Sequence, residues 1–75
     1  MDNYTEKWIK NDLLVYQNRI KENQEQIDFF KGYYQRHREN SEMRTVTSKI
    51  IGGLENETRG YRKDITRLKA SIKPL

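Results

Sequence analysis

Apolar side chains recur along the first half of the chain at alternating intervals of three and four residues, and this spacing is the strongest constraint on its fold. The row comprises Ile9, Leu13, Tyr16, Ile20, Asn23, Ile27, Phe30 and Tyr34. An α-helix brings side chains at these intervals onto one line. The single polar member, Asn23, is typical of residues that fix the register of packed helices at a cost in stability. We therefore expect one long helix that packs against other helices.

Capping residues and breaks in the pattern set the expected bounds of the helices. Asn3 followed by Glu6 has the spacing of an N-terminal capping box, so we expect the first helix over about residues 3–38. Residues 39–41 interrupt the pattern and form the expected turn, in which Asn40 or Ser41 can cap a second helix. The second helix is expected over about residues 42–73, because Pro74 cannot continue it.

The apolar row of the second helix is less regular than that of the first. We place in it Ile50, Leu54, Tyr61, Ile65, Leu68 and Ile72. Gly52-Gly53 lies within this row, and each glycine inside a helix costs about 1 kcal/mol relative to alanine. If the chain folds back at residues 39–41, positions whose numbers sum to about 80 face each other. Large residues such as Ile27 then oppose glycines such as Gly53, so we expect either a kink at the glycine pair or a close approach of the helices.

The length of the chain limits how much core it can form alone. It has 75 residues, of which 33% are hydrophobic and none is cysteine, so neither a disulfide nor a thiolate metal site can stabilise it. Two helices cannot enclose a core, and a lone hairpin leaves half of each apolar row in water. We therefore expect residues 1–75 to form one all-α domain, a hairpin of two long antiparallel helices, that assembles into a homodimeric or larger bundle.

Residues that support catalysis are scarce. His37 is the only histidine and lies near the expected turn, where a histidine is usually solvated. We find no cluster with metal-ligand spacing and no glycine-rich phosphate loop between a strand and a helix. The sequence predicts a protein that is not an enzyme and that binds neither a metal nor a cofactor.

Two groups of side chains are candidates for contact with a partner or ligand. Tyr4 and Trp8 lie off the main row, and exposed aromatic residues often anchor interfaces. Around the expected turn, aromatic and basic residues alternate in a way that suits stacking on bases and contact with phosphates. These residues are Tyr33, Arg36, His37, Arg38 and Arg44. Alternatively, the aromatic residues complete an oligomer core and the turn arginines are simply solvated.

Positive charge is concentrated near the C-terminal end of the sequence. The net charge is +4, and residues 59–73 hold six basic groups against Asp64 alone. Such asymmetry favours an anionic partner, with Arg59, Arg62, Lys63 and Arg67 as the candidate anion-binding residues. The alternative is an ordinary solvated helix face. No helix-turn-helix motif accompanies these residues, so the pattern predicts binding that tolerates any base sequence. We see neither a signal peptide nor a membrane span, and we expect a cytoplasmic location in a bacterium or an infected host.

Three segments resemble the N-terminal helical part of small phage late-transcription regulators of the ArpU/RinA type. They are residues 11–16, 41–47 and 65–72. The resemblance implies a phage origin and an oligomerising or regulator-binding module. In that family, DNA-reading helices would follow, and this sequence departs from the pattern because it stops at Leu75.

Three functional hypotheses follow. The leading one is a self-associating, phage-encoded helical protein that binds an acidic surface and modulates or inhibits a host macromolecule. The second is a nucleic-acid-binding regulator that uses the basic C-terminal helix. The third is an oligomeric sponge that sequesters an anionic, cyclic nucleotide with Tyr33, Tyr34, Arg36 and Arg38.

Overall fold

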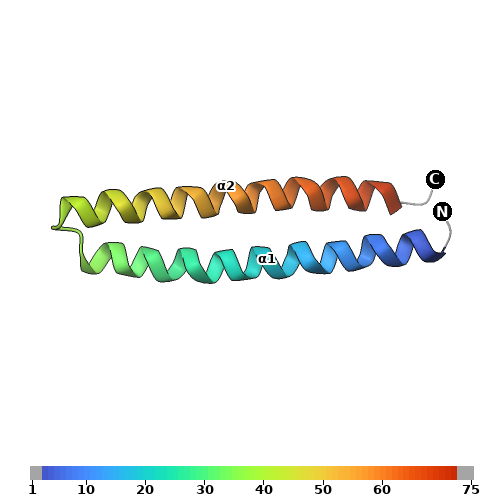
Figure 1. Cartoon of the computed structure of the whole chain (residues 1–75), viewed down its shortest axis with the longest axis horizontal. Coiled ribbons are helices and arrows are strands. Elements are labelled where there is room, and N and C mark those ends of the chain that lie inside the picture. The colour runs from blue at the N-terminus through green and yellow to red at the C-terminus, as the bar shows by residue number, and fades with distance from the viewer. Residues whose placement is uncertain (1–2, 73–75) are drawn as a thin grey trace.

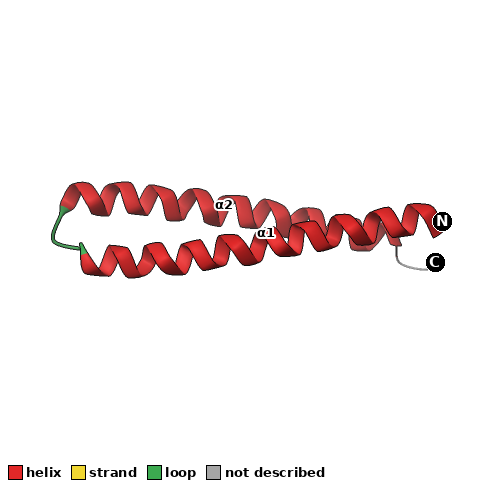
Figure 2. Cartoon of the chain, turned by 60° about the horizontal axis from the view of Figure 1, so that its bottom comes forward, coloured by secondary structure: helices red, strands yellow, loops and turns green. Residues whose placement is uncertain are grey.

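The computed structural model shows two antiparallel α-helices joined by a short turn, which confirms the all-α hairpin predicted from the sequence (Figure 1). The structure describes residues 3–72 and the side chains of residues 5–71. Helix α1 spans Asn3–Arg36 and helix α2 spans Ser41–Ile72. The two helices lie side by side along their length in Figure 1, and their ribbons cross toward the end opposite the turn in Figure 2. The rod measures 56 by 15 by 13 Å.

The turn begins two residues earlier than expected, because α1 ends at Arg36 rather than near residue 38. The backbone N–H of His37 donates to the carbonyl oxygens of both Tyr33 and Tyr34, at 3.1 and 3.2 Å, and so closes the last turn of α1. Of the two expected caps for α2, Asn40 is the one used: its Oδ1 accepts a hydrogen bond from the backbone N–H of Met43 at 3.1 Å.

The α1 side of the helix interface follows the predicted row. Asn23 and Ile27 are buried, and the other members of the row, Ile9, Leu13, Tyr16, Ile20, Phe30 and Tyr34, are half-buried. Ile27, 3% exposed, is the only buried hydrophobic residue in the described part of the chain. The core of the hairpin is therefore one row of side chains deep.

The α2 side of the interface differs from the prediction in its first half. The row placed Ile50 in the interface, but this side chain is 37% exposed. Thr47 and Thr58 are buried instead. The residues of α2 that pack toward α1 are Thr47, Ile51, Leu54, Thr58, Tyr61, Ile65 and Leu68. This row keeps the alternation of three and four residues that Ile50 breaks. The side chain of Ile72 lies outside the described residues.

The glycines of α2 do not have the role expected of them. Helix α2 continues without a break through Gly52-Gly53. A Cβ atom added at Gly52, Gly53 or Gly60 would meet no atom within 4 Å, so these glycines do not receive large side chains from α1. The expected register is nevertheless correct, since Asn23 contacts Glu57 and Thr58. Interface side chains, rather than glycines, set the separation of the helices.

Candidate functional site

A polar layer crosses the middle of the hairpin. The Nδ2 atom of Asn23 donates to Oγ1 of Thr58 at 3.3 Å and to Oε1 of Glu57 at 3.2 Å. The hydroxyl of Tyr61 donates to the same Glu57 oxygen at 2.9 Å. These hydrogen bonds, from Asn23 first and Tyr61 second, lower the pKa of Glu57. The bond to Glu57 also raises the pKa of Tyr61. The layer fixes how α1 and α2 align.

One contact beside this layer shows which outer rows of the two helices share a side of the hairpin. The guanidinium of Arg19 lies 5.7 Å from the centre of the Tyr61 ring, and its positive charge also lowers the pKa of Glu57. Arg19 and Glu57 therefore flank the interface on the same side. In two helices that stay paired along their length, residues seven apart keep the same position relative to the partner helix.

The side marked by Arg19 and Glu57 displays exposed apolar residues, and we call it the apolar face. Ile50 lies seven residues before Glu57 in α2, and Val15 lies four before Arg19 in α1. Steps of seven from Val15 add Trp8 and Phe29 to the face. In α2, Val46, Gly53 and Gly60 each lie three or four residues from Ile50 or Glu57, which places them in the neighbouring row of the same face. Five of the six exposed large hydrophobic residues lie here, including Phe29 at 61% and Trp8 at 56% exposure. The sixth, Leu14, lies on the opposite side.

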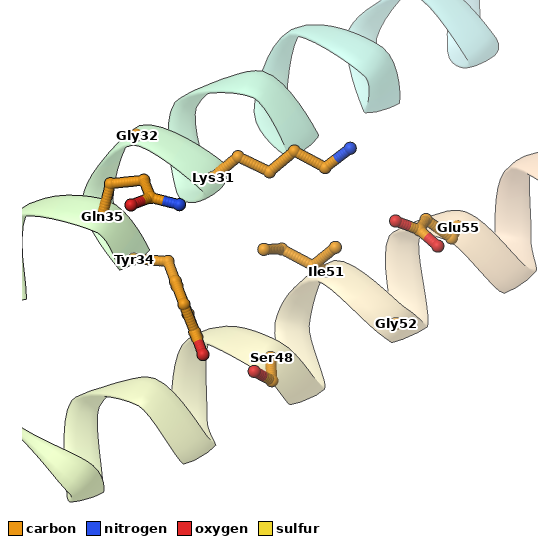
Figure 3. A pocket seen from close by; sticks show the side chains of 8 residues that line it. All are labelled: Lys31, Gly32, Tyr34, Gln35, Ser48, Ile51, Gly52 and Glu55. Atoms are coloured by element: carbon orange, nitrogen blue, oxygen red, sulfur yellow. The ribbon is translucent and has the colours of Figure 1, made fainter. Parts of the chain in front are cut away.

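The opposite side contains an open groove between the helices near the turn (Figure 3). It is lined by Lys31, Gly32, Tyr34, Gln35, Ser48, Ile51, Gly52 and Glu55. In Figure 3, Ile51 points between the helices, Tyr34 extends toward Ser48, and Lys31 extends toward the Glu55 end of the groove. The groove residues therefore show which positions of each helix lie on this side, and residues seven apart from them lie on it too.

Toward the helix ends, the same rows carry only basic charges. Steps of seven or its multiples connect Lys31 with Lys10, and Gln35 with Lys21 and Lys7. In α2 the steps connect Gly52 with Arg59, and Glu55 with Arg62 and Lys69. We call these six exposed residues, Lys7, Lys10, Lys21, Arg59, Arg62 and Lys69, the basic face. In the half of the hairpin opposite the turn, no acidic residue among the described residues occupies these rows. Glu6 of a neighbouring row forms an ion pair with Lys10 at 3.2 Å.

The four candidate anion-binding residues are thus divided between surfaces. All four are exposed. Arg59 and Arg62 belong to the basic face, Lys63 lies at the outer edge of α2, and Arg67 follows Gly60 by seven residues and joins the apolar face. The sequence prediction missed Lys7, Lys10 and Lys21 of α1. The seven-residue spacing of these lysines from groove residues identifies them, but only once the alignment of the helices is known.

The candidate residues around the turn do not converge on one pocket. The rings of Tyr33 and His37 lie 4.3 Å apart, whereas Tyr34 lines the groove on the basic side. Arg36, His37 and Arg38 line a hollow around the turn itself. Arg44 of α2 lines a separate hollow together with Tyr34 of α1. The side chain of Tyr4 lies outside the described residues.

Comparisons with known proteins add no family to this geometry. No protein-family model matches the chain, and no curated protein or solved structure does so. Across the described residues we find no group of three or more His, Cys, Asp or Glu side chains that could hold a metal ion. Neither α1 nor α2, as described, has an apolar stretch long enough to cross a bilayer.

Proposed function

We propose that this chain is a non-enzymatic binding protein whose basic face attaches to an anionic macromolecule, with double-stranded nucleic acid as the partner. The observation that carries the proposal is the set of six exposed basic residues that both helices contribute to one side, in rows that hold no acidic residue over that half of the rod. A net charge of +4 alone would not indicate where on the surface a partner binds. The position of the six basic residues on one side of the hairpin does indicate it.

The dimensions of the basic face suit a phosphate backbone. Lys7 and Lys21 are 14 residues apart, which is about 21 Å along a helix at 1.5 Å per residue. Duplex DNA presents one negative charge per roughly 1.7 Å of its axis, so a face of this length spans about 12 phosphates. Lys and Arg side chains that neutralise phosphates give affinity without base readout. The proposal therefore includes no preference for a base sequence.

Salt dependence of duplex binding tests the proposal. Fluorescence anisotropy with a labelled duplex should show log K falling with log salt concentration, with a slope of about −5 if all six groups contact phosphates. Arg59→Gln with Arg62→Gln should reduce the steepness of this slope by about 2. The matched control, Lys49→Gln with Lys63→Gln, removes two exposed charges at the outer edge of α2, off the basic face, and should change the slope little. Absence of binding at 50 mM salt, or equal effects of the two pairs, would contradict the proposal.

The resemblance to phage late-transcription regulators supports a further proposal, that the protein is phage-encoded and modulates a host macromolecule. A tagged pull-down from a bacterial lysate, with and without nuclease, separates two versions of this idea. Host proteins that detach on nuclease treatment are held through nucleic acid, as the basic face leads us to expect. A host protein that stays bound after nuclease treatment would instead favour a direct acidic protein partner.

The cyclic-nucleotide sponge has weaker support, because Tyr33, Tyr34, Arg36 and Arg38 line separate surfaces in one chain. A thermal-shift screen tests it, since a ligand at about 100 times its Kd stabilises a protein by about 2.7 kcal/mol. A shift with a cyclic nucleotide that Arg38→Gln removes would revive this hypothesis.

A further inference from the structure

The apolar face leaves several large apolar side chains exposed in the turn half of the rod. Phe29 and Val46 are well exposed there, and Ile50 and Gly53 lie on the same face. A second hydrophobic row outside a core that is one row deep is what a four-helix bundle requires. We propose that a second copy of this chain packs on the apolar face, with the two turns at the same end of the assembly.

The area of the face is sufficient for a stable dimer. A face of 56 by 15 Å offers roughly 800 Å² per chain, which matches the area that each partner buries in an interface of standard size. Trp8 is of a residue type that often contributes a large binding energy, and phenylalanines such as Phe29 are enriched in interfaces. Packing on this face also leaves the basic face of each copy outward, so the inference does not depend on the proposed nucleic-acid binding.

The sizes of the residues on this face favour one orientation. The large residues Trp8 and Phe29 lie on α1, whereas Gly53 and Gly60 lie on α2 with open space where a Cβ would be. A two-fold axis along the rod places α1 of one copy over α2 of the other. Residues whose numbers sum to about 80 lie at the same height, so Phe29 meets Ile50 and Gly53 of the second copy. Phe29 of one copy then fills the space beside Gly53 of the other.

The charges on the face favour the same orientation. With the turns together, Asp12 lies near Arg67 of the second copy, and Arg19 lies near Asp64 of the second copy. One pair of like charges, Glu22 with Glu57 of the second copy, lies between them, and that Glu57 is already bonded to Asn23 and Tyr61 of its own chain. The reverse orientation would press Asp12 onto Phe29 and Arg67 onto Ile50, and burying a charge against apolar groups is costly. Opposite charges and apolar groups are thus both matched only when the turns coincide.

Light scattering on size-fractionated protein tests the assembly. We expect twice the 9.1 kDa chain mass at micromolar concentration. Phe29→Ser should raise the dimer dissociation constant by about 30-fold or more. The matched control is Leu14→Ser, because Leu14 is similarly exposed, at 56%, but lies on the opposite side. Circular dichroism should show that both variants stay helical. A monomer at every concentration, or equal effects of the two substitutions, would overturn the proposal.

Spin labels test the orientation separately. The chain has no cysteine, so Glu39→Cys places one label at each turn. Double electron–electron resonance on the dimer should then report a distance well below the 56 Å length of the rod. A distance close to that length would show that the turns lie at opposite ends, and the proposed packing would be wrong.

Discussion

The two broad sides of this hairpin come from the same heptads yet have opposite chemistry. The apolar face combines Phe29, Ile50 and Val46 with glycines, whereas the basic face has six cations and no acid in its rows toward the helix ends. The interface between the helices determines which rows point outward, and the residues in those rows determine what each side can bind. A thin core can therefore support two separate binding surfaces, provided that the alignment of α1 and α2 is fixed.

The largest expected effect comes from substitution of Ile27, because the interface between α1 and α2 holds both faces in place. Ile27→Ala removes the only buried hydrophobic side chain of the described part and should lower the free energy of unfolding by about 2–5 kcal/mol. Both faces would then be lost together. Chemical denaturation followed by circular dichroism measures this change. Phe29→Ala is the comparison: it should destabilise the protein only at concentrations where dimers form. A larger loss for Phe29→Ala at low concentration would contradict the division into interface and face.

Removing the polar layer should stabilise the hairpin while weakening its alignment. In Asn23→Leu with Thr58→Leu, two buried polar groups are replaced together, so neither is left without its hydrogen bond. We expect a gain of about 1–2 kcal/mol from added apolar burial, with broader spin-label distances across the hairpin. Asn18→Leu, at an exposed position of α1, is the control and should change neither property. A double variant less stable than the natural chain would show that the layer contributes net stability.

Two neighbouring glycines allow the faces to be compared directly. Gly52 and Gly53 both have open space at the Cβ position, but Gly52 lies in the rows of the basic side and Gly53 on the apolar face. Replacing either with alanine should stabilise the helix by about 1 kcal/mol. Only Gly53→Ala should also change the dimer dissociation constant, as measured by sedimentation. An equal effect of both variants on dimerisation would remove Gly53 from the interface.

The smallest expected effect is a pH dependence of stability at the polar layer. The lowered pKa of Glu57 means that its stabilising contribution is present above the ordinary pKa of a glutamate and is lost as the pH falls through the lowered value. The raised pKa of Tyr61 works at the other end: its contribution is present below the ordinary tyrosine pKa and is lost as the pH rises through the raised value. Thermal melts measured across pH should show a loss of stability at the acid end and another at the alkaline end.

Substitution of Glu57 separates this layer from other titrating groups. Glu57→Gln keeps an acceptor for Asn23 but cannot ionise, so the loss of stability in acid should become smaller. The loss of stability at high pH should also weaken, because the Glu57 carboxylate, whose hydrogen bond and charge raise the pKa of Tyr61, is gone. Unchanged pH profiles in this variant would assign both losses to other residues.

Much of the fold could be predicted from the sequence, and the misplaced part of α2 has a clear cause. Every residue in the α1 row from Ile9 to Tyr34 is buried or half-buried because apolar side chains mark the pattern almost without interruption. In α2, the interface uses Thr47 and Thr58, whose hydroxyl groups made them look like surface residues. Thr58 is buried because Asn23 donates to its hydroxyl, a pairing that is visible only across the two helices. Extending the alternation backward from Leu68 through Tyr61 would have found both threonines.

The candidate site could be predicted only in part, because it depends on two helices at once. Arg59 and Arg62 stood out as part of a basic stretch, whereas Lys7, Lys10 and Lys21 are scattered among acidic residues in α1. Their common side becomes apparent only from the alignment that Asn23 and Glu57 establish. Likewise, residues near one another in the sequence around the turn, such as Tyr33 and Tyr34, point to different surfaces.

The hairpin connection has a mechanical consequence. Asn3 and Ile72 mark helix ends that lie at the same end of the rod, opposite the turn (Figure 1). Tension applied between them would therefore separate the helices from that end toward the turn. Each increment of extension then breaks one layer of contacts between the helices. In shearing, by contrast, all layers would bear the load at once. We expect rupture at low force in an optical trap. Opening should pause once the Asn23–Thr58 hydrogen bond has broken, because the next layer toward the turn contains the buried Ile27.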